Sequence, residues 1–407
     1  MGIVTWSTDL AGLDSARIDF GLAGGGFTMS APVDLTVPGL RTLLLGMKGS
    51  ENYEFQIVAN AGQQTCQSEV FSLTTGPVSN DVPSLVHQVS LPAEVAPGFI
   101  ITASGLGGGG PGGGGGGGSS MAFILDADGS VVWWAEAPGG TGRVRMSWEG
   151  TDIWMMSVNN GGGSGELRRV SMDGLDVETN ISGFTEAHHD FTVMPGGIVV
   201  APMWLAGAGG GQGGGQGCSS IVQRTADGTI SELIPDVSVF YQPQNECHVN
   251  AIHYHSGDDS FTISDRNPSL FVKFSRTGTL QWQFGGSNPV GPYFSGSWNV
   301  NHGHHLLPNG NMLFFNNNGG SGSSPVFEYQ LDASSFTATQ VWSYDSGTTS
   351  NTLGDVQRLS NGNTLVTYSN AGVMHEVNAQ RQLIQSYTTD SLGYTMHRES
   401  LYGPPPR

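Results

Sequence analysis

A strand–turn–strand pattern that recurs along most of the chain constrains the fold more than any other feature. Six copies align: AFILDADGSVVWW, LRRVSMDGLDVE, IVQRTADGTISELI, FVKFSRTGTLQWQF, FEYQLDASSFTATQVW and MHEVNAQRQLIQSY. Their turns lie about 45–55 residues apart, a period typical of propeller blades. A second hairpin, such as LLPNGNMLFFNN, precedes each copy and completes four strands per unit. The sequence therefore predicts a six-bladed β-propeller, with five or seven blades as alternatives if the first unit is misassigned.

The residues before the repeats predict a smaller domain. Short runs such as ARIDFGL, LRTLLLG and YEFQIVAN are typical of strands in a β-sandwich, and Leu45 to Tyr53 resembles the tyrosine corner of fibronectin type III-like sandwiches. The segment GPVSNDVPS suits a linker. We therefore expect an all-β chain with a sandwich over residues 1–86 and the propeller over residues 87–407.

Charge and hydropathy narrow the class of partner. The net charge is −19, and the chain contains no cluster of lysine and arginine that could neutralise phosphates. No run of 18 apolar residues occurs, as a membrane-spanning helix would require. We therefore expect small-molecule partners, no nucleic acid and no membrane span, and a homodimer is left open.

Cysteine usage and the N-terminus bear on the compartment. The three cysteines, Cys66, Cys218 and Cys247, cannot all pair within one chain. Cys218 and Cys247 either bridge neighbouring strands or stay as buried thiols. The N-terminal MGIVTWSTDLAG is not a signal peptide, but the low lysine content and the Gly/Ser tracts suit a periplasmic or extracellular protein.

Three glycine-rich inserts interrupt the units at residues 107–120, 207–217 and 319–324. Each falls between the second and third predicted strands of its unit. They are either flexible surface loops or loops that rim a functional site.

Histidines recur at one position of the repeat. His189 and His302 each lie eight residues before the glycine of their first turn, and His248 lies nine residues before its turn glycine. The sixth unit has Gly354 at this position. Because the first strand of each propeller blade lines the central channel, we expect the three imidazoles to converge at one mouth of that channel.

Other residues are expected at the same mouth, because strands in a blade are antiparallel. The second strands end there with Asp265 and Arg266 in one unit and with residues 316–318, all asparagine, in the next. Arg266 either contacts a ligand or pairs with a nearby carboxylate. Aromatic residues of adjoining segments either line the site or pack locally, namely Trp204, Phe240, Tyr241, Tyr293, Phe294 and Trp298. His253 and His255 are expected to be ordinary strand residues.

This combination predicts group-transfer chemistry. Three histidines could hold Zn²⁺ or Cu²⁺, but an adjacent guanidinium suits an oxyanion better than a cation. Neutral imidazole is a nucleophile and a proton carrier near pH 7, and aromatic rings suit an aryl group. We therefore expect transfer of an anionic group such as sulfuryl between phenols, without a metal or other cofactor.

The chain resembles the bacterial arylsulfate sulfotransferase family that is independent of phosphoadenosine phosphosulfate. The resemblance lies in HHD at 188–190, HVNAI at 248–252, SDRN at 264–267 and HGHHLLPNGNMLFFNN at 302–317. It implies a six-bladed propeller and ping-pong transfer from an aryl sulfate to a phenol through a sulfohistidine. The nucleophile would be His302, with Arg266 binding the sulfuryl group. The supporting residues would be His189 and His248, with Asn250 as an extra contact.

The chain departs from the family pattern beside the nucleophile. Asn301 and Gly303 flank His302, where the family often has Gln and Asp. His304 or His305 could therefore be the nucleophile, and His188 could replace His189. The alternative function is a non-catalytic binding or structural propeller whose histidines hold a small anion or a divalent metal.

Overall fold

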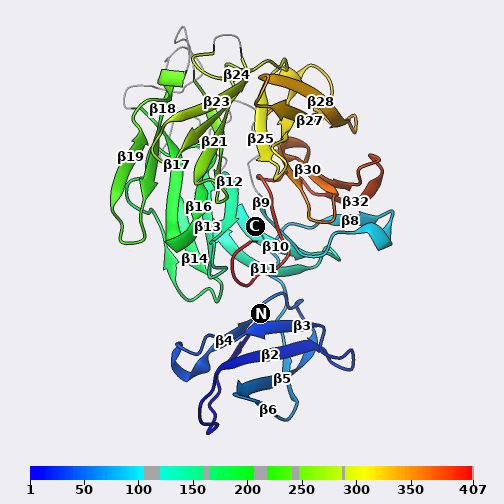
Figure 1. Cartoon of the computed structure of the whole chain (residues 1–407). Helices are drawn as coiled ribbons and strands as arrows, with labels where there is room; N and C mark the ends of the chain where they lie inside the picture. Colours follow the sequence, from blue (N-terminus) through cyan, green and yellow to red (C-terminus); the bar gives the residue numbers. More distant parts are fainter. Residues whose placement is uncertain (105–119, 159–164, 206–217, 241–246, 287–288, 406–407) are drawn as a thin grey trace.

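The computed structural model describes residues 1–104, 120–158, 165–205, 218–240, 247–286 and 289–405. Within these ranges the regular structure consists of β-strands and short 3-10 segments, without an α-helix (Figure 1). Six sheets of four or five strands follow one another over residues 86–398, and we number them as blades 1 to 6. The all-β class and the propeller architecture predicted from the sequence are confirmed.

The strands of the first three blades run in order from the centre outwards. Blade 1 contains β33 (Met396–Arg398), β9 (Phe99–Ser104), β10 (Ser120–Asp126) and β11 (Val131–Ala137). Blade 2 contains β12 (Thr141–Met146), β13 (Asp152–Ser157), β14 (Leu167–Ser171) and β15 (Val177–Glu178). Blade 3 contains β16 (Thr192–Met194), β17 (Ile198–Trp204), β18 (Ser219–Arg224) and β19 (Ile230–Ile234).

The remaining blades follow the same order. Blade 4 contains β20 (Val249–His255), β21 (Ser260–Asp265), β22 (Leu270–Ser275), β23 (Leu280–Gly285) and β24 (Tyr293–Phe294). Blade 5 contains β25 (Asn301–Leu306), β26 (Met312–Asn316), β27 (Val326–Asp332) and β28 (Thr337–Tyr344). Blade 6 contains β29 (Asp355–Arg358), β30 (Thr364–Tyr368), β31 (Val373–Val377), β32 (Leu383–Thr388) and β8 (Val86–Val89).

The first strands of the blades surround the centre of the propeller. Strand β12 contacts β16, β16 contacts β20, β20 contacts β25 and β25 contacts β29. The described side chains of β12 and β16 are all buried, and those of β25 are buried over its first four residues. Side chains at the start of these strands are therefore brought together from different blades.

Both ends of the repeat region close the ring. Strand β33, near the C-terminus, pairs with β9 and supplies the first strand of blade 1, and β8 adds to the outer edge of blade 6. The first unit of the repeat therefore lacks a first strand of its own. The sequence around either strand does not indicate that the two strands pair, because nearly 300 residues separate β9 from β33.

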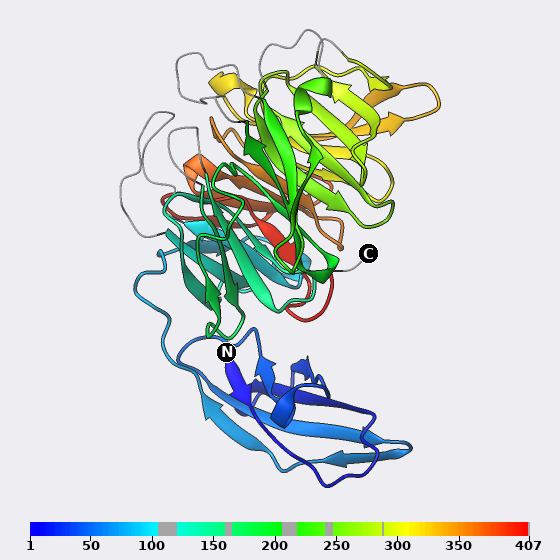
Figure 2. The same ribbon diagram turned by 90° about the vertical axis from the view of Figure 1, so that its left-hand side faces the viewer.

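The N-terminal residues form two further sheets below the propeller (Figures 1 and 2). They comprise β1 (Gly2–Val4), β2 (Ser15–Leu22), β3 (Met29–Pro32), β4 (Thr42–Leu44), β5 (Asn52–Ala61), β6 (Gln64–Gln67) and β7 (Phe71–Thr74). The Tyr53 hydroxyl accepts a hydrogen bond from the Lys48 backbone N–H at 2.8 Å, the contact expected of a tyrosine corner.

Turns between the third and fourth strands of the blades hold the N-terminal sheets. Arg41 forms an ion pair with Asp173, and Lys48 forms one with Asp128. Because strands alternate in direction, these turns lie at the face opposite the start of each first strand. The N-terminal sheets therefore contact the face of the propeller that lies away from the predicted site.

Candidate functional site

The structure brings His189, His248 and His302 together with Arg266. His189 precedes β16, His248 directly precedes β20, and His302 is the second residue of β25. The Nε2 atoms of His189 and His248 lie 3.1 Å apart, with ring centroids separated by 4.6 Å. The charges of Arg266 and His302 both act on His189, which places all four groups at one site.

Asn317 fixes the protonation of the His302 ring. The Asn317 Nδ2 donates to the carbonyls of Ser350 and Leu353 at 2.7 Å each, so its Oδ1 must face His302. That Oδ1 hydrogen-bonds to His302 Nδ1 and can only accept, so Nδ1 carries the proton. The lone pair of the neutral ring is therefore on Nε2.

Burial keeps the site imidazoles neutral near pH 7. Desolvation, together with the charge of Arg266, lowers the pKa of His302 to about 3 and that of His248 to about 4. The pKa of His189 is lowered well below its ordinary value by burial and then by His248. A neutral imidazole retains a lone pair, as nucleophilic attack and proton uptake both require.

Arg266 is held beside His248 by the turn that follows β21. Its backbone N–H donates to the His248 carbonyl at 3.0 Å, and the Asp265 carboxylate accepts from the His248 N–H at 2.8 Å. The guanidinium is half-buried and donates to Asn267 at 3.2 Å. No carboxylate among the described residues forms an ion pair with it, so its charge is available to an anion.

A disulfide joins the segments that precede two site residues. Cys218 and Cys247 are bonded, with Cα atoms 4.6 Å apart. Ser219, which hydrogen-bonds to His188, follows the first cysteine, and His248 follows the second. Of the two arrangements left open by the sequence, the bridge is the one observed, while Cys66 is free.

A buried ion cluster lies next to the histidines, and sequence reasoning missed it. Arg143 pairs with Asp190 and with Asp355 at 2.6 Å each, and Arg145 lies 3.3 Å from Asp190. All four side chains are buried. Burial by itself would lower the pKa of Arg143, but the two carboxylates raise it, so Arg143 stays charged, whereas burial raises the pKa of Asp355.

The repeat alignment contained a signal for this cluster. Arg143, Asp190 and Asp355 each lie seven residues before the glycine of their first turn, one position after the histidine register. Because first strands line the central channel, charged residues that share this position in different blades lie close to one another at the channel. The ion pairs therefore lock blades 2, 3 and 6 together directly beside His189.

Gly303 occupies the same register in blade 5. A Cβ atom there would collide with Asp355 Oδ1 and lie 2.7 Å from the Asp355 Cα, so only glycine fits. Backbone strain is also present at the site, because His189 has φ +62° and Val300 has φ +65°. Such conformations in non-glycine residues cost about 1–3 kcal/mol each and are common at functional sites.

The predicted aromatic residues lie in different surroundings. Trp204 is at the site, since its ring stacks on His188 at 3.8 Å and meets His248 edge to face at 5.5 Å. Trp298 packs against Phe271, Phe284, Phe314 and Tyr329 in a cluster between blades 4 and 5.

The structure describes three of the other predicted aromatic residues. Tyr293 lies in the outermost strand of blade 4 and donates to the Gly286 carbonyl, and Phe294 is buried against Trp282. Phe240 packs against Phe274, and Tyr241 is outside the described residues. Substrate contacts by Tyr293, Trp298 and Tyr241 stay predictions.

The alternate histidines point into packed surroundings. His304 is fully buried, with Nε2 hydrogen-bonded to Thr262 and its ring against His253 and Phe271. His305 Nδ1 accepts from the backbone N–H of Arg358. His188 is buried and hydrogen-bonds to His189. Among the positions 302, 304 and 305, His302 is therefore the one whose pKa the charge of Arg266 lowers.

Asn250 and His255 each hydrogen-bond to a residue of a neighbouring strand. Asn250 is buried and donates to the Asn301 carbonyl at 2.7 Å, which ties blade 4 to blade 5 beneath the site. His255 hydrogen-bonds to Thr262. A substrate contact by Asn250 stays a prediction.

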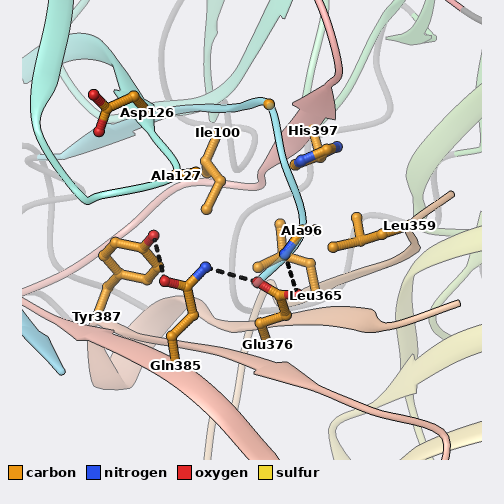
Figure 3. A pocket seen from close by; sticks show the side chains of 11 residues that line it. Ala96, Ile100, Asp126, Ala127, Leu359, Leu365, Glu376, Gln385, Tyr387 and His397 are labelled. Atoms are coloured by element: carbon orange, nitrogen blue, oxygen red, sulfur yellow. Dashed lines mark hydrogen bonds between the residues drawn. The ribbon is translucent and has the colours of Figure 1, made fainter. Parts of the chain in front are cut away.

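A small cavity elsewhere in the propeller is separate from this site. It lies between blades 1 and 6 and has room for about one water molecule. Figure 3 shows Tyr387, Gln385 and Glu376 linked by hydrogen bonds along its wall. An aryl sulfate is too large for this space.

Metal-binding clusters and membrane-spanning helices are both absent from the described ranges. No three His, Cys, Asp or Glu side chains of these residues are grouped closely enough to hold a metal ion. No helix within the same ranges could span a membrane.

Solved structures that match this chain share little sequence with it. A catalytically inactive virginiamycin B lyase from Staphylococcus aureus is 13% identical, with a TM-score of 0.43, and the alignment covers 74% of this chain and 88% of that one. The periplasmic gluconolactonase of Pseudomonas aeruginosa is 12% identical, with a TM-score of 0.45, over 74% and 98%. A Bacteroides thetaiotaomicron protein of unknown function is 11% identical, with a TM-score of 0.42, over 95% and 93%.

The family comparison concerns the part of the chain that holds most of the site. No curated protein matches the chain significantly. The model of the family described as arylsulfotransferase (ASST) matches residues 222–400, which include His248, Arg266 and His302. The match covers less than half of the chain, and it confirms the resemblance to the arylsulfotransferase family that the sequence indicates.

Proposed function

We propose that the chain is an aryl sulfotransferase that works by a ping-pong mechanism, with His302 Nε2 as the nucleophile. The family supports aryl sulfotransferase activity in general. The observation that supports the finer mechanism is the hydrogen bond between Asn317 Oδ1 and His302 Nδ1, because it leaves the Nε2 lone pair free to attack. His189, His248 and Arg266 lie close enough to act on the same bound group.

In the first half-reaction, His302 Nε2 attacks the sulfur of an aryl sulfate. The N–S bond forms as the bond between sulfur and the aryl oxygen breaks, and the electron pair of that bond goes to the phenolate. His248, at the half-buried end of the histidine pair, takes up a proton when the aryl sulfate anion binds, because the negative charge favours the imidazolium, and gives that proton to the departing phenolate. Arg266 offsets the negative charge on the sulfuryl oxygens.

The second half-reaction runs the same steps in reverse with an acceptor phenol. His248, now with a lone pair, removes the phenolic proton as the oxygen attacks sulfur. The N–S bond breaks and its electron pair returns to His302 Nε2, which restores the enzyme. Two easier steps replace one direct transfer between two anionic or weakly nucleophilic oxygens.

The disulfide bears on the compartment in which this chemistry takes place. Such bonds persist in oxidising environments, and the Cys218–Cys247 bond lies beside the site. We propose a periplasmic or extracellular location, where phenols and aryl sulfates are the small-molecule partners.

The test is release of phenol from 4-nitrophenyl sulfate with and without an acceptor phenol. A ping-pong sulfotransferase releases nitrophenol faster as the acceptor concentration rises, and His302→Asn abolishes the release. Absence of turnover by the wild-type protein with a panel of aryl sulfates and phenols contradicts the proposal and favours the non-catalytic alternative, for which metal analysis and anion binding are the direct measurements.

A further inference from the structure

A continuous line of hydrogen bonds runs inward from His248. His248 Nε2 meets His189 Nε2 at 3.1 Å, and His189 Nδ1 meets His188 Nδ1 at 2.9 Å. His188 Nε2 in turn meets the Ser219 hydroxyl at 2.9 Å. His188 and Ser219 are fully buried, while His248 is half-buried. The line therefore connects the open end of the site with the interior of blade 3.

The tautomers of the three rings depend on one another. A neutral imidazole has one N–H and one lone pair, and each hydrogen bond of the line needs one of each. If His248 Nε2 carries its proton, His189 must be protonated on Nδ1 and His188 on Nε2, which then donates to Ser219. This leaves a lone pair on His248 Nδ1, for which no partner is present among the described residues.

We propose that His188, His189 and His248 act as one relay that holds the proton exchanged with the phenol in each half-reaction. This inference rests on the proposed function and adds His188 and Ser219 to it as positioning residues. Neither His188 nor Ser219 needs to touch the substrate, because they act through His189.

The proton count balances along the line. When a phenol gives its proton to His248 Nδ1, His248 Nε2–H can pass its own proton to His189 Nε2. His189 Nδ1–H then passes a proton to His188 Nδ1, and His188 becomes an imidazolium that donates to Ser219. The phenolic oxygen retains the electron pair with which it attacks sulfur. Return of the protons in the opposite order supplies the proton to the departing phenolate of the next donor.

Two features of the surroundings act on a charge at the inner end of the relay in opposite directions. Full burial lowers the pKa of His188 well below its ordinary value and so opposes the charge. The Trp204 ring stacks on His188 at 3.8 Å and an angle of 15°, and an aromatic face attracts a cation. The charge of Arg266 acts on His248 and His189, so its repulsion and the attraction of the Trp204 ring together offset part of the cost of burial.

Substitution of His188 by phenylalanine tests the relay, because the ring can still stack on Trp204 but cannot carry a proton. We expect kcat/KM for phenyl sulfate, which has a poor leaving group, to fall at least 10-fold. The value for 4-nitrophenyl sulfate should fall less than 3-fold, because nitrophenolate departs without a proton. His375→Phe is the matched control, since His375 lies in blade 6, is half-buried and hydrogen-bonds to Tyr344 of blade 5. Equal losses for both donors overturn the proposal.

A second measurement does not depend on turnover. In protein with ¹⁵N-labelled histidine, the nitrogen shifts report which ring atom is protonated. We expect His188→Phe to change the tautomer of His248, two rings away, and His375→Phe to leave it unchanged. An unaltered His248 tautomer in His188→Phe overturns the relay even if the wild-type protein is an active sulfotransferase. A wild-type protein that is inactive on every aryl sulfate overturns the proposed function, and with it the role of the relay in catalysis.

Discussion

Replacement of Asn317 by alanine tests how the nucleophile is prepared. The Asn317 side chain is fully buried, and it is the group that keeps the proton on His302 Nδ1. Without it, the tautomer with hydrogen on Nε2 becomes populated, and that form cannot attack sulfur. The remaining Nδ1–H would also be left without its acceptor in a buried position.

The magnitude follows from the lost hydrogen bonds. An unsatisfied buried donor costs about 1–3 kcal/mol, so loss of the tautomer control should lower kcat/KM for an aryl sulfate roughly 30- to 150-fold, equivalent to about 2–3 kcal/mol. The two bonds to the carbonyls of Ser350 and Leu353 are lost as well. Unfolding in urea should therefore show a free energy of unfolding lower by about 2–4 kcal/mol.

The matched control is Asn309→Ala, which removes an exposed turn asparagine of the same blade. It should change neither rate nor stability by more than about 0.5–1 kcal/mol. The reasoning is refuted if Asn317→Ala is destabilised as expected but retains the wild-type kcat/KM, because the tautomer would then not depend on Asn317.

Three other perturbations have defined outcomes. Gly303→Ala should lower the free energy of unfolding by at least about 3 kcal/mol, measured in urea, because its Cβ displaces Asp355 from the ion cluster; unchanged stability would contradict the close approach. The double substitution Cys218→Ser and Cys247→Ser should cost about 3–4 kcal/mol for a separation of 29 residues and reduce turnover, whereas Cys66→Ser should change neither. Thermal stability should fall as the pH drops from 6.5 towards 4, because five buried or half-buried histidines have pKa values of about 3 to 4 in the folded protein. The unfolded chain then binds more protons, and each histidine removes about 2 kcal/mol at pH 5; a melting temperature that is flat from pH 7 to pH 4.5 would contradict their burial.

The histidine cluster could be predicted because the repeat fixes which residues share a position in the blade. Alignment on the turn glycines placed His189, His248 and His302 at the start of first strands, and the structure brings them together. The same alignment contained Arg143 and Asp190 one position later. The ion cluster could therefore have been predicted from the sequence, because charged residues are rare in strands that face a channel.

Other features could not be predicted from the sequence, because they depend on contacts between distant segments. The pairing of β33 with β9 closes the ring across the whole propeller. Whether an aromatic side chain lines a site or packs between blades depends on its rotamer and neighbours, which differ for Trp204 and Trp298. The orientation of the Asn317 amide depends on two carbonyls more than 30 residues further along the chain.

The most direct test of the central claim is the mass of the protein after brief incubation with an aryl sulfate in the absence of acceptor. The account predicts a stoichiometric gain of about 80 Da that maps to the peptide containing His302, is absent in His302→Asn, and disappears when a phenol is added, as a ping-pong intermediate requires. An active protein that gains no such mass, or that gains it at another residue, would contradict the account.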